Sequence, residues 1–348
     1  MTPSTNDVRK FLRRVAKLLS PSRSAQGAYS GSRDEPDYLT WFKHHTSKDE
    51  AYQRWTSVPF AQLSTVPGML SGEELQFLYF VAREFYSGRG EIVDAGAFLG
   101  ASAQSFAAGL HDNPSVGHKI KRIFSYDFFE FSDFYSSYLP DYRLKIGDDT
   151  LPLFYEFTKE FSAYITAIKG DICQQTWPRR NIEILFVDFT QRWQHHEFVV
   201  RNFYTNLIPG QSLVIHQDYI YTVCYWLHIF MEYYSDPFNL ISPLIRNSTA
   251  AWLYTRRLPD DAFRIPLNER LSFSDLLALF DRSLAKYTAT AAGLLKCARG
   301  RLILHGVGPT HAMEYATMLE QEYRDDFDIL SHVTILENEI RRSSCEIS

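Results

Sequence analysis

The stretch EIVDAGAFLGAS, residues 91–102, combines two glycines with polar side chains at a spacing that could form a ligand pocket. Asp94 ends an apolar run, and Gly96 and Gly100 stand where the chain must turn. Glycine tolerates positive φ and leaves room for a ligand against the backbone. A helix that starts near Ser102 presents free N–H groups to the same place. The pattern predicts a strand, a turn and a helix start around a nucleotide-type pocket, although many other strand-to-helix turns contain two glycines.

The spacing of this turn differs from GxGxxG, the fingerprint of pyrophosphate binding. Phe98 stands where one alignment of the fingerprint requires glycine, and Gly100 begins no matching triplet. The sequence therefore disfavours an NAD site and leaves other nucleoside cofactors open.

Two further carboxylates follow apolar, strand-like runs downstream of the turn. Asp127 ends the run IFSYD, where a carboxylate can accept two hydrogen bonds from ribose hydroxyls. Asp171 and Ile172 follow the next run, where an acid can meet an adenine amino group. Each acid alone is more simply a surface residue. Their order, each after a predicted strand, indicates a nucleoside pocket.

Predicted strands and helices that alternate along the chain position the glycine turn and the carboxylates. Strands alternating with helices predict a mainly parallel sheet covered on both faces, with ligands at the carboxyl ends of the strands. A hairpin of two further strands is expected to close the sheet at its edge. The predicted strands are 92–95, 122–127, 164–169, 182–188, 212–218, 238–243 and 250–255, and the predicted helices are about 101–110, 196–206 and 223–234.

The N-terminal flank begins with a basic amphipathic helix over residues 1–20, whose apolar residues recur at helical spacing between 8 and 19. Such a helix either anchors reversibly on an anionic membrane or docks on its own domain or a partner subunit. A flexible linker over 21–36 and an irregular extension over 37–69 follow. Ser71 and Glu74 then predict a capping box before a helix.

The C-terminal flank, residues 259–348, is predicted to form a helical extension. Apolar periodicity marks helices over 273–284, 288–297 and 311–323, with a break around 306–309. We expect this extension to serve packing or homo-oligomer formation.

Bulk composition narrows the class of protein. The formal net charge of −5 and pI near 6.1 argue against a surface that binds nucleic acid throughout. The four cysteines form no CxxC pair, so a reducing cytoplasm fits better than a disulfide framework or a zinc site. No apolar run approaches the roughly 18 residues of a membrane span, and no signal peptide opens the chain. We expect a cytoplasmic protein, soluble or peripheral at the membrane.

On these motifs, residues 70–258 resemble the class I S-adenosylmethionine-dependent methyltransferases, and most of all the branch of macrocin-type sugar O-methyltransferases and cephalosporin hydroxylase-like proteins. The resemblance lies in DAGAFLGAS, Asp127, Gly170-Asp171, IEILFVDF and LIPGQSLVIHQDY. It implies an α/β, Rossmann-like, seven-stranded sheet whose last strand is antiparallel. It also implies methyl transfer with S-adenosylmethionine bound by Asp94, Gly96, Ala97, Phe98, Gly100, Ser102, Asp127, Asp171, Ile172 and Asp188.

The chain departs from the metal-dependent members of this branch, which carry Asp-Gly-Asp after the fourth strand and Asp-Asp after the fifth. The corresponding runs here are Asp188-Phe189-Thr190 and Gln217-Asp218. Magnesium often needs only one or two protein carboxylates, so Asp188 and Asp218 could still hold it. The other interpretation is that both acids contact the cofactor or cap the following loops.

The methyl acceptor requires a base and a binding surface. His216 is the candidate base because imidazole titrates near neutrality, and Asp188 and Asp218 lie at the neighbouring strand ends. By strand alternation the side chains of His216 and Asp218 share a face of the sheet. One of them can therefore point into the helix layer on that face instead of into the cleft. His196, Trp193 and Tyr219 are candidates for contact with the acceptor.

Two functions stay open at this stage. The first is O-methylation of a sugar or another hydroxylated small molecule. The second is a non-catalytic methyltransferase-fold protein in a membrane-associated assembly, with residues 8–19 as the peripheral contact. An iron hydroxylase is a third candidate, but no two-His-one-carboxylate motif stands out.

Overall fold

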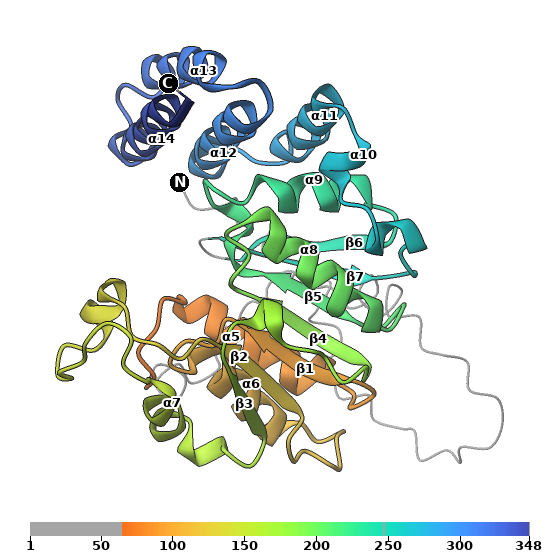
Figure 1. Ribbon diagram of the computed structural model, residues 1–348. Coiled ribbons are helices and arrows are strands. Elements are labelled where there is room, and N and C mark those ends of the chain that lie inside the picture. Colours follow the sequence, from red (N-terminus) through yellow and green to blue (C-terminus); the bar gives the residue numbers. More distant parts are fainter. Residues whose placement is uncertain (1–64, 246–247, 348) are drawn as a thin grey trace.

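The computed structural model describes residues 65–245 and 248–347, and within this part of the chain seven strands form one sheet. Their order is β3-β2-β1-β4-β5-β7-β6 (Figure 1). The pairings from β3 to β5 are parallel, and β7 is antiparallel to both β5 and β6. The α/β class and the hairpin at the edge are confirmed. The strands are β1 (Glu91–Ala95), β2 (Ile123–Asp127), β3 (Ile165–Lys169), β4 (Ile182–Val187), β5 (Leu213–His216), β6 (Phe238–Ile245) and β7 (Thr249–Tyr254).

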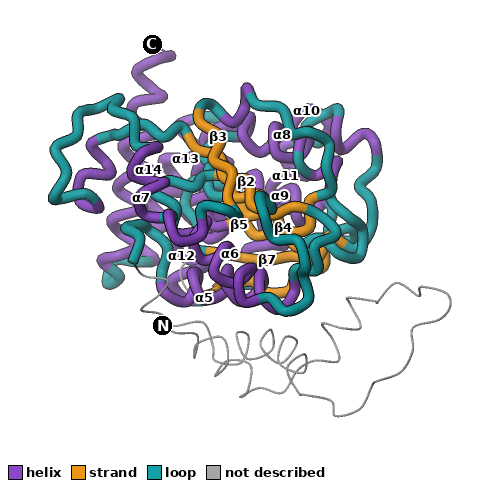
Figure 2. Tube along the Cα trace, turned by 90° about the horizontal axis from the view of Figure 1, so that it is seen from below, coloured by secondary structure: helices purple, strands orange, loops and turns teal. Residues whose placement is uncertain are grey.

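Helices lie on both sides of the strands (Figure 2). No helix among the described residues is long and apolar enough to cross a membrane. The predicted helix over 1–20, the linker over 21–36 and residues 37–64 of the predicted irregular extension lie outside the described residues. The helices are α5 (Gly72–Phe80), α6 (Ala101–Asp112), α7 (Leu151–Phe157), α8 (Trp193–Asn202), α9 (Tyr225–Tyr233), α10 (Leu267–Arg270), α11 (Phe273–Leu284), α12 (Ala289–Val307), α13 (Pro309–Glu322) and α14 (Phe327–Ile347), with a π-turn η2 (Val81–Phe85) and short 3₁₀ turns elsewhere.

Side chains of the central strands alternate between two apolar layers. In β4, Ile184 and Phe186 pack in one cluster with α5 and α6. Leu185 and Val187 pack in the other cluster with α8 and α9. Every residue of β4 is buried, so the strand is covered on both faces, and Glu183 is its one charged residue.

The capping box predicted for α5 is present. The Ser71 side chain accepts from the Glu74 N–H, and the Glu74 carboxylate accepts from the Ser71 N–H at 2.8 Å. The same carboxylate also accepts a hydrogen bond from Thr249 Oγ1 at 2.7 Å. This contact ties the start of α5 to β7.

Two predicted elements differ from the structure. The strand expected over 212–218 ends at His216, and residues 217–220 form a 3₁₀ turn. The helix expected over 288–297 continues to Val307 and ends before Gly308, whose φ is +98°. Helices α11 to α14 gather at one end of the molecule above α9 (Figure 1), and α11 packs against α9.

An irregular segment, residues 128–150, connects β2 to α7 and contains the 3₁₀ turn η3 (Asp133–Tyr138). We call it the aromatic arm. Its base is hairpin-like, because Phe131 N–H donates to Asp148 O at 2.8 Å and Glu130 bridges Asp149. The arm projects from the β2–β3 end of the sheet, in yellow in Figure 1.

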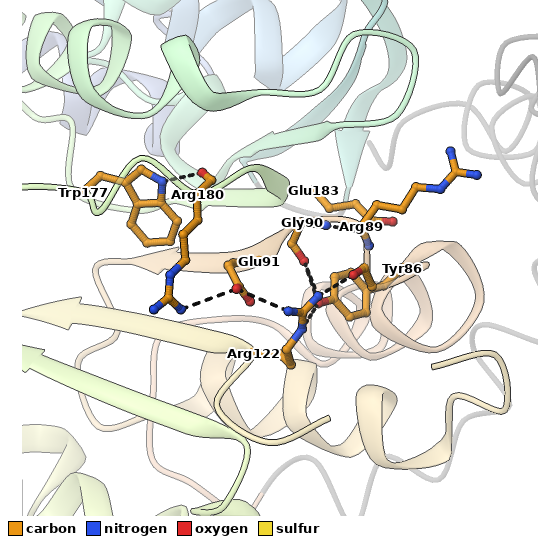
Figure 3. A network of polar contacts seen from close by, with 9 residues as sticks. Tyr86, Arg89, Gly90, Glu91, Arg122, Trp177, Arg180 and Glu183 are labelled. Atoms are coloured by element: carbon orange, nitrogen blue, oxygen red, sulfur yellow. Dashed lines mark hydrogen bonds and ion pairs between the residues drawn. The ribbon is translucent and has the colours of Figure 1, made fainter. Parts of the chain in front are cut away.

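A network of polar contacts joins strands β1, β2 and β4 at their amino ends (Figure 3). Arg122 donates to Tyr86 Oη at 2.9 Å and to Glu91 at 3.3 Å, and Arg180 lies 3.6 Å from Glu91. The buried Glu183 carboxylate accepts three backbone N–H groups from the segment before β1. These bonds fix the strand ends opposite to the glycine turn, so the network is structural.

Candidate cofactor site

Gly96 brings the turn after β1 against β4. Its φ is +102°, and a Cβ placed on it would lie 2.3 Å from the backbone oxygen of Asp188. Gly100, with φ +99°, is the residue that precedes α6. The N–H groups of Gly96 and Ala97 both donate to the Tyr126 carbonyl, at 2.9 and 3.0 Å. The main chains of β1, β2 and β4 therefore converge at this turn, as a close backbone approach requires.

Asp94 supports the turn from beneath. Its buried side chain accepts a hydrogen bond from Ser125 Oγ at 2.9 Å and bonds to the Ser102 side chain in the first turn of α6. Burial raises the pKa of Asp94 to about 7, against the opposing effect of the two serines. Among the described residues, its second oxygen, Oδ1, has no hydrogen-bond partner. Asp94 and Ser102, both predicted cofactor contacts, thus bond to each other and hold the helix start.

Asp127 lies at the end of β2, between the glycine turn and the aromatic arm. One carboxylate oxygen accepts from the Phe98 N–H at 2.9 Å and the other from the Phe129 N–H at 2.8 Å. Burial raises the pKa of Asp127, and the backbone N–H groups oppose that shift. Each oxygen keeps a further lone pair for a ligand hydroxyl. This position fits the predicted contact with ribose.

Asp171 lies at the end of β3, next to Asp127 across the sheet. It caps a 3₁₀ turn, η5 (Ile172–Gln174), by accepting from the Cys173 N–H at 2.9 Å. Ile172 is buried beside it. The cap accounts for one carboxylate oxygen, and the other accepts a hydrogen bond from Gln174 Nε2 at 3.1 Å. The structure brings Asp171, Asp127 and the glycine turn to adjoining strand ends.

Asp188 and Asp218, at the ends of β4 and β5, are close enough to influence each other. Burial and the neighbouring charge of Asp218 raise the pKa of Asp188 well above its usual range, with smaller effects from Asp94, Glu74 and Asp127. Burial and the charge of Glu74 raise the pKa of Asp218. The described residues contain no group of three or more side chains arranged to hold a metal ion. The strand ends therefore bring carboxyl groups together whose ionised forms are disfavoured, and a bound cation would favour their ionisation.

His216 and Tyr219 do not face this site, which corrects two predictions. His216 is fully buried under α8, where its Nε2 lies 2.7 Å from Tyr204 Oη, and burial lowers its pKa well below the usual range. Tyr219 is also buried, with its ring 4.0 Å from that of His228. Strand alternation directs His216 to the helix layer, while the turn after β5 leaves Asp218 near Asp188.

His196 and Trp193 line a groove between α8, α9 and residues 262–267. The His196 ring is buried, burial lowers its pKa to about 3, and neither of its nitrogens has a hydrogen-bond partner among the described residues. Trp226 Nε1 donates to Thr190 O at 3.0 Å, which places one end of the groove beside the loop after β4.

Two residues near the site were not predicted from the sequence to be part of it. Glu74 was predicted only as a helix cap, but its charge reaches Asp188 and Asp218. Tyr135, in the aromatic arm, packs against Phe98 with ring centroids 4.3 Å apart and ring planes tilted by 34°. No periodicity in the arm marks Tyr135, so only its aromatic density could have drawn attention to it.

No protein-family model and no curated protein matches this chain. Several solved structures do match it. The O-methyltransferase NovP is 14% identical with a TM-score of 0.42, and the match covers 55% of this chain and 83% of NovP. CalS11, a TDP-rhamnose 3′-O-methyltransferase of calicheamicin biosynthesis, is 17% identical with a TM-score of 0.40, covering 61% of this chain and 97% of CalS11. Cofactor-bound Rv0187 from MTB is 10% identical with a TM-score of 0.35, covering 64% and 99%.

Among the described residues, one sheet holds the strands in the order β3-β2-β1-β4-β5-β7-β6, and β7 alone runs antiparallel. The fold is a seven-stranded, Rossmann-like α/β sheet. In this fold the glycine turn, Asp127 and Asp188 lie together at the carboxyl ends of neighbouring strands, where ligands of open α/β sheets bind.

Proposed function

We propose that the chain binds S-adenosylmethionine and transfers its methyl group to a hydroxyl of a small molecule, with a sugar as the acceptor class. One observation carries the proposal: Gly96, tight against Asp188, lies between the carboxylates of Asp127 and Asp188 at adjoining strand ends. Asp94 Oδ1, which has no hydrogen-bond partner among the described residues, and the carboxylates of Asp127 and Asp188 fit a ligand that carries positive charge.

The order of strands matches the order of groups in this cofactor. Asp171 and Ile172 on β3 would meet the adenine, and Asp127 on β2 would accept the ribose hydroxyls. The turn at Gly96 would pass under the methionine part. Asp188 on β4 would then lie nearest the sulfur and its methyl group.

S-adenosylmethionine supplies an electrophilic methyl group when it is bound. The protein must align the acceptor hydroxyl in line with that methyl group and take its proton. Since His216 is buried under α8, Asp188 and Asp218 are the groups placed to do this. They would act either as the base or as ligands of Mg²⁺, which activates a hydroxyl in the same place.

The sugar class of acceptor rests on the sequence resemblance to macrocin-type enzymes. Trp193 and His196 remain the candidates for acceptor contact, because α8 begins directly after the loop that follows Asp188. An aromatic groove with one buried imidazole suits a ligand with an apolar face and few polar groups.

Titration calorimetry with S-adenosylmethionine and S-adenosylhomocysteine tests cofactor binding. Asp127→Ala should weaken both by roughly 10- to 100-fold, since hydrogen bonds to a charged group are lost. Asp149→Ala, an exposed acid in the aromatic arm, is the matched control and should leave both unchanged. If the wild type binds neither compound, the proposed cofactor is wrong.

Transfer of a labelled methyl group to a panel of sugars and other hydroxylated compounds tests catalysis, with and without Mg²⁺. Asp218→Asn should reduce turnover more than cofactor affinity. An equal loss of both would show that Asp218 serves the cofactor, and binding without turnover on any acceptor would favour a non-catalytic protein.

A further inference from the structure

The aromatic arm is packed against the site and does not hang free. Phe131 and Leu139 of the arm are buried in a cluster with residues of α5 and α6, which fixes the segment between them. Within that segment Phe134 is 70% exposed, while Tyr135 is half-buried. The arm therefore directs the ring of Phe134 toward solvent and the ring of Tyr135 toward the protein.

The position of Tyr135 is defined by the glycine turn. Its ring centroid lies 4.3 Å from that of Phe98, and the Phe98 N–H donates to Asp127 at 2.9 Å. The Tyr135 hydroxyl lies close enough to Asp127 and Asp188 for their charges, together with burial, to raise its pKa. Tyr135 therefore lies against the glycine turn, which follows β1 between β2 and β4.

The sulfur of the proposed cofactor belongs at the same turn. The ribose is assigned to Asp127, and the acceptor to the region of Asp188 and Asp218. The sulfur is the atom between the ribose and the transferred methyl group. It carries a positive charge in S-adenosylmethionine and is neutral in S-adenosylhomocysteine.

The surroundings of the turn favour a cation. Burial is the largest influence that raises the pKa of Asp188, and the charges of other carboxylates, those of Asp218, Asp94, Glu74 and Asp127, add to it. An aromatic face also attracts a cation through its ring quadrupole, most strongly where water is excluded. A half-buried tyrosine ring beside carboxylates meets both conditions.

We propose that Tyr135 presents its ring to the methylsulfonium, so that the site binds the methyl donor more tightly than the demethylated product. The inference rests on the proposed binding of S-adenosylmethionine and adds a residue that distinguishes its charged form. Such a preference favours release of S-adenosylhomocysteine after transfer. The carboxylates supply charge, and Tyr135 supplies the selective contact.

Calorimetry with S-adenosylmethionine and S-adenosylhomocysteine on the full chain tests this, and needs no acceptor. Tyr135→Leu should weaken binding of the charged compound by roughly 3- to 30-fold, the range of a desolvated cation–π contact, and leave the neutral compound within about twofold. Tyr135→Phe keeps the ring and should keep the preference. Tyr142→Leu, whose ring in the same arm packs on Phe157, is the matched control and should change neither affinity.

An equal loss of both affinities in Tyr135→Leu would overturn the inference, because Tyr135 would then contact a part that the two compounds share. Unchanged affinities would overturn it as well. If Tyr135→Leu does not fold, Tyr135→Phe tests the inference instead. This variant keeps the ring, so loss of its preference for S-adenosylmethionine over S-adenosylhomocysteine would overturn the inference. A wild type that binds neither compound refutes the proposed function instead, so the two failures are distinguishable.

Discussion

Replacing Gly96 with alanine would test the close approach of the glycine turn to β4. An alanine at a φ of +102° costs about 1–2 kcal/mol, because Cβ crowds the following carbonyl in left-handed conformations. The new Cβ would also lie 2.3 Å from Asp188 O. Relieving that contact through a backbone shift should cost about 1–3 kcal/mol more. The expected loss in the free energy of unfolding is therefore about 2–5 kcal/mol.

Gly210→Ala separates the two contributions. Gly210 also has positive φ, +77°, but a Cβ on it would meet nothing within 4 Å. Only the conformational cost should remain, about 1–2 kcal/mol. Urea unfolding of both variants measures the difference, and calorimetry measures cofactor affinity, which Gly96→Ala should reduce at least tenfold and Gly210→Ala should leave unchanged. Equal losses of stability, or wild-type affinity in Gly96→Ala, would refute the reasoning.

Three further predictions concern groups around the site. Burial raises the pKa of Asp94 to about 7, so its protonated form contributes stability that is complete below the unfolded pKa near 4 and is lost as the pH rises through 7. The loss should reach up to roughly 4 kcal/mol between pH 4 and 8. Asp94→Asn should remove this pH dependence from the free energy of unfolding measured in urea. Tyr204→Phe removes the hydrogen bond to His216 and should cost about 1–3 kcal/mol of stability with unchanged cofactor affinity; a selective loss of methyl transfer would instead restore His216 as a catalytic candidate. Arg301→Ala breaks a buried contact between α12 and the loop after β5 and should lower stability by about 3 kcal/mol, whereas Arg341→Ala, which removes an exposed ion pair, should cost under about 0.5 kcal/mol; similar effects would mean that the buried contact does not form.

Local sequence patterns predicted most of the elements. The apolar run before Asp94 and the two glycines after it placed β1, the turn and α6, because these features depend on neighbouring residues alone. The capping box at Ser71 and Glu74 was predicted for the same reason. The end of β5 was placed two residues too late, since Gln217 and Asp218 continue a strand-like pattern that only the 3₁₀ turn interrupts.

The direction of side chains at strand ends depended on more than sequence spacing. Alternation places His216 and Asp218 on the same face of a continuous strand, so it could not predict that the two side chains separate. In the structure β5 ends at His216, whose ring is buried against Tyr204, and the turn that follows leaves Asp218 beside Asp188. The structure therefore removes His216 as the candidate base and leaves the two predicted carboxylates, Asp188 and Asp218.

The sequence by itself determined the glycine turn, the carboxylates that follow successive strands, and the alternation that makes an α/β sheet. These are properties of short segments, in which backbone freedom and apolar periodicity act locally. Only the tertiary structure decided that Glu74 from α5 adds its charge to Asp188 and that Tyr135 from the aromatic arm lies over the turn. Both contacts join segments far apart in the chain, and they form because the parallel sheet brings the carboxyl ends of its strands, and the segments packed above them, to one edge.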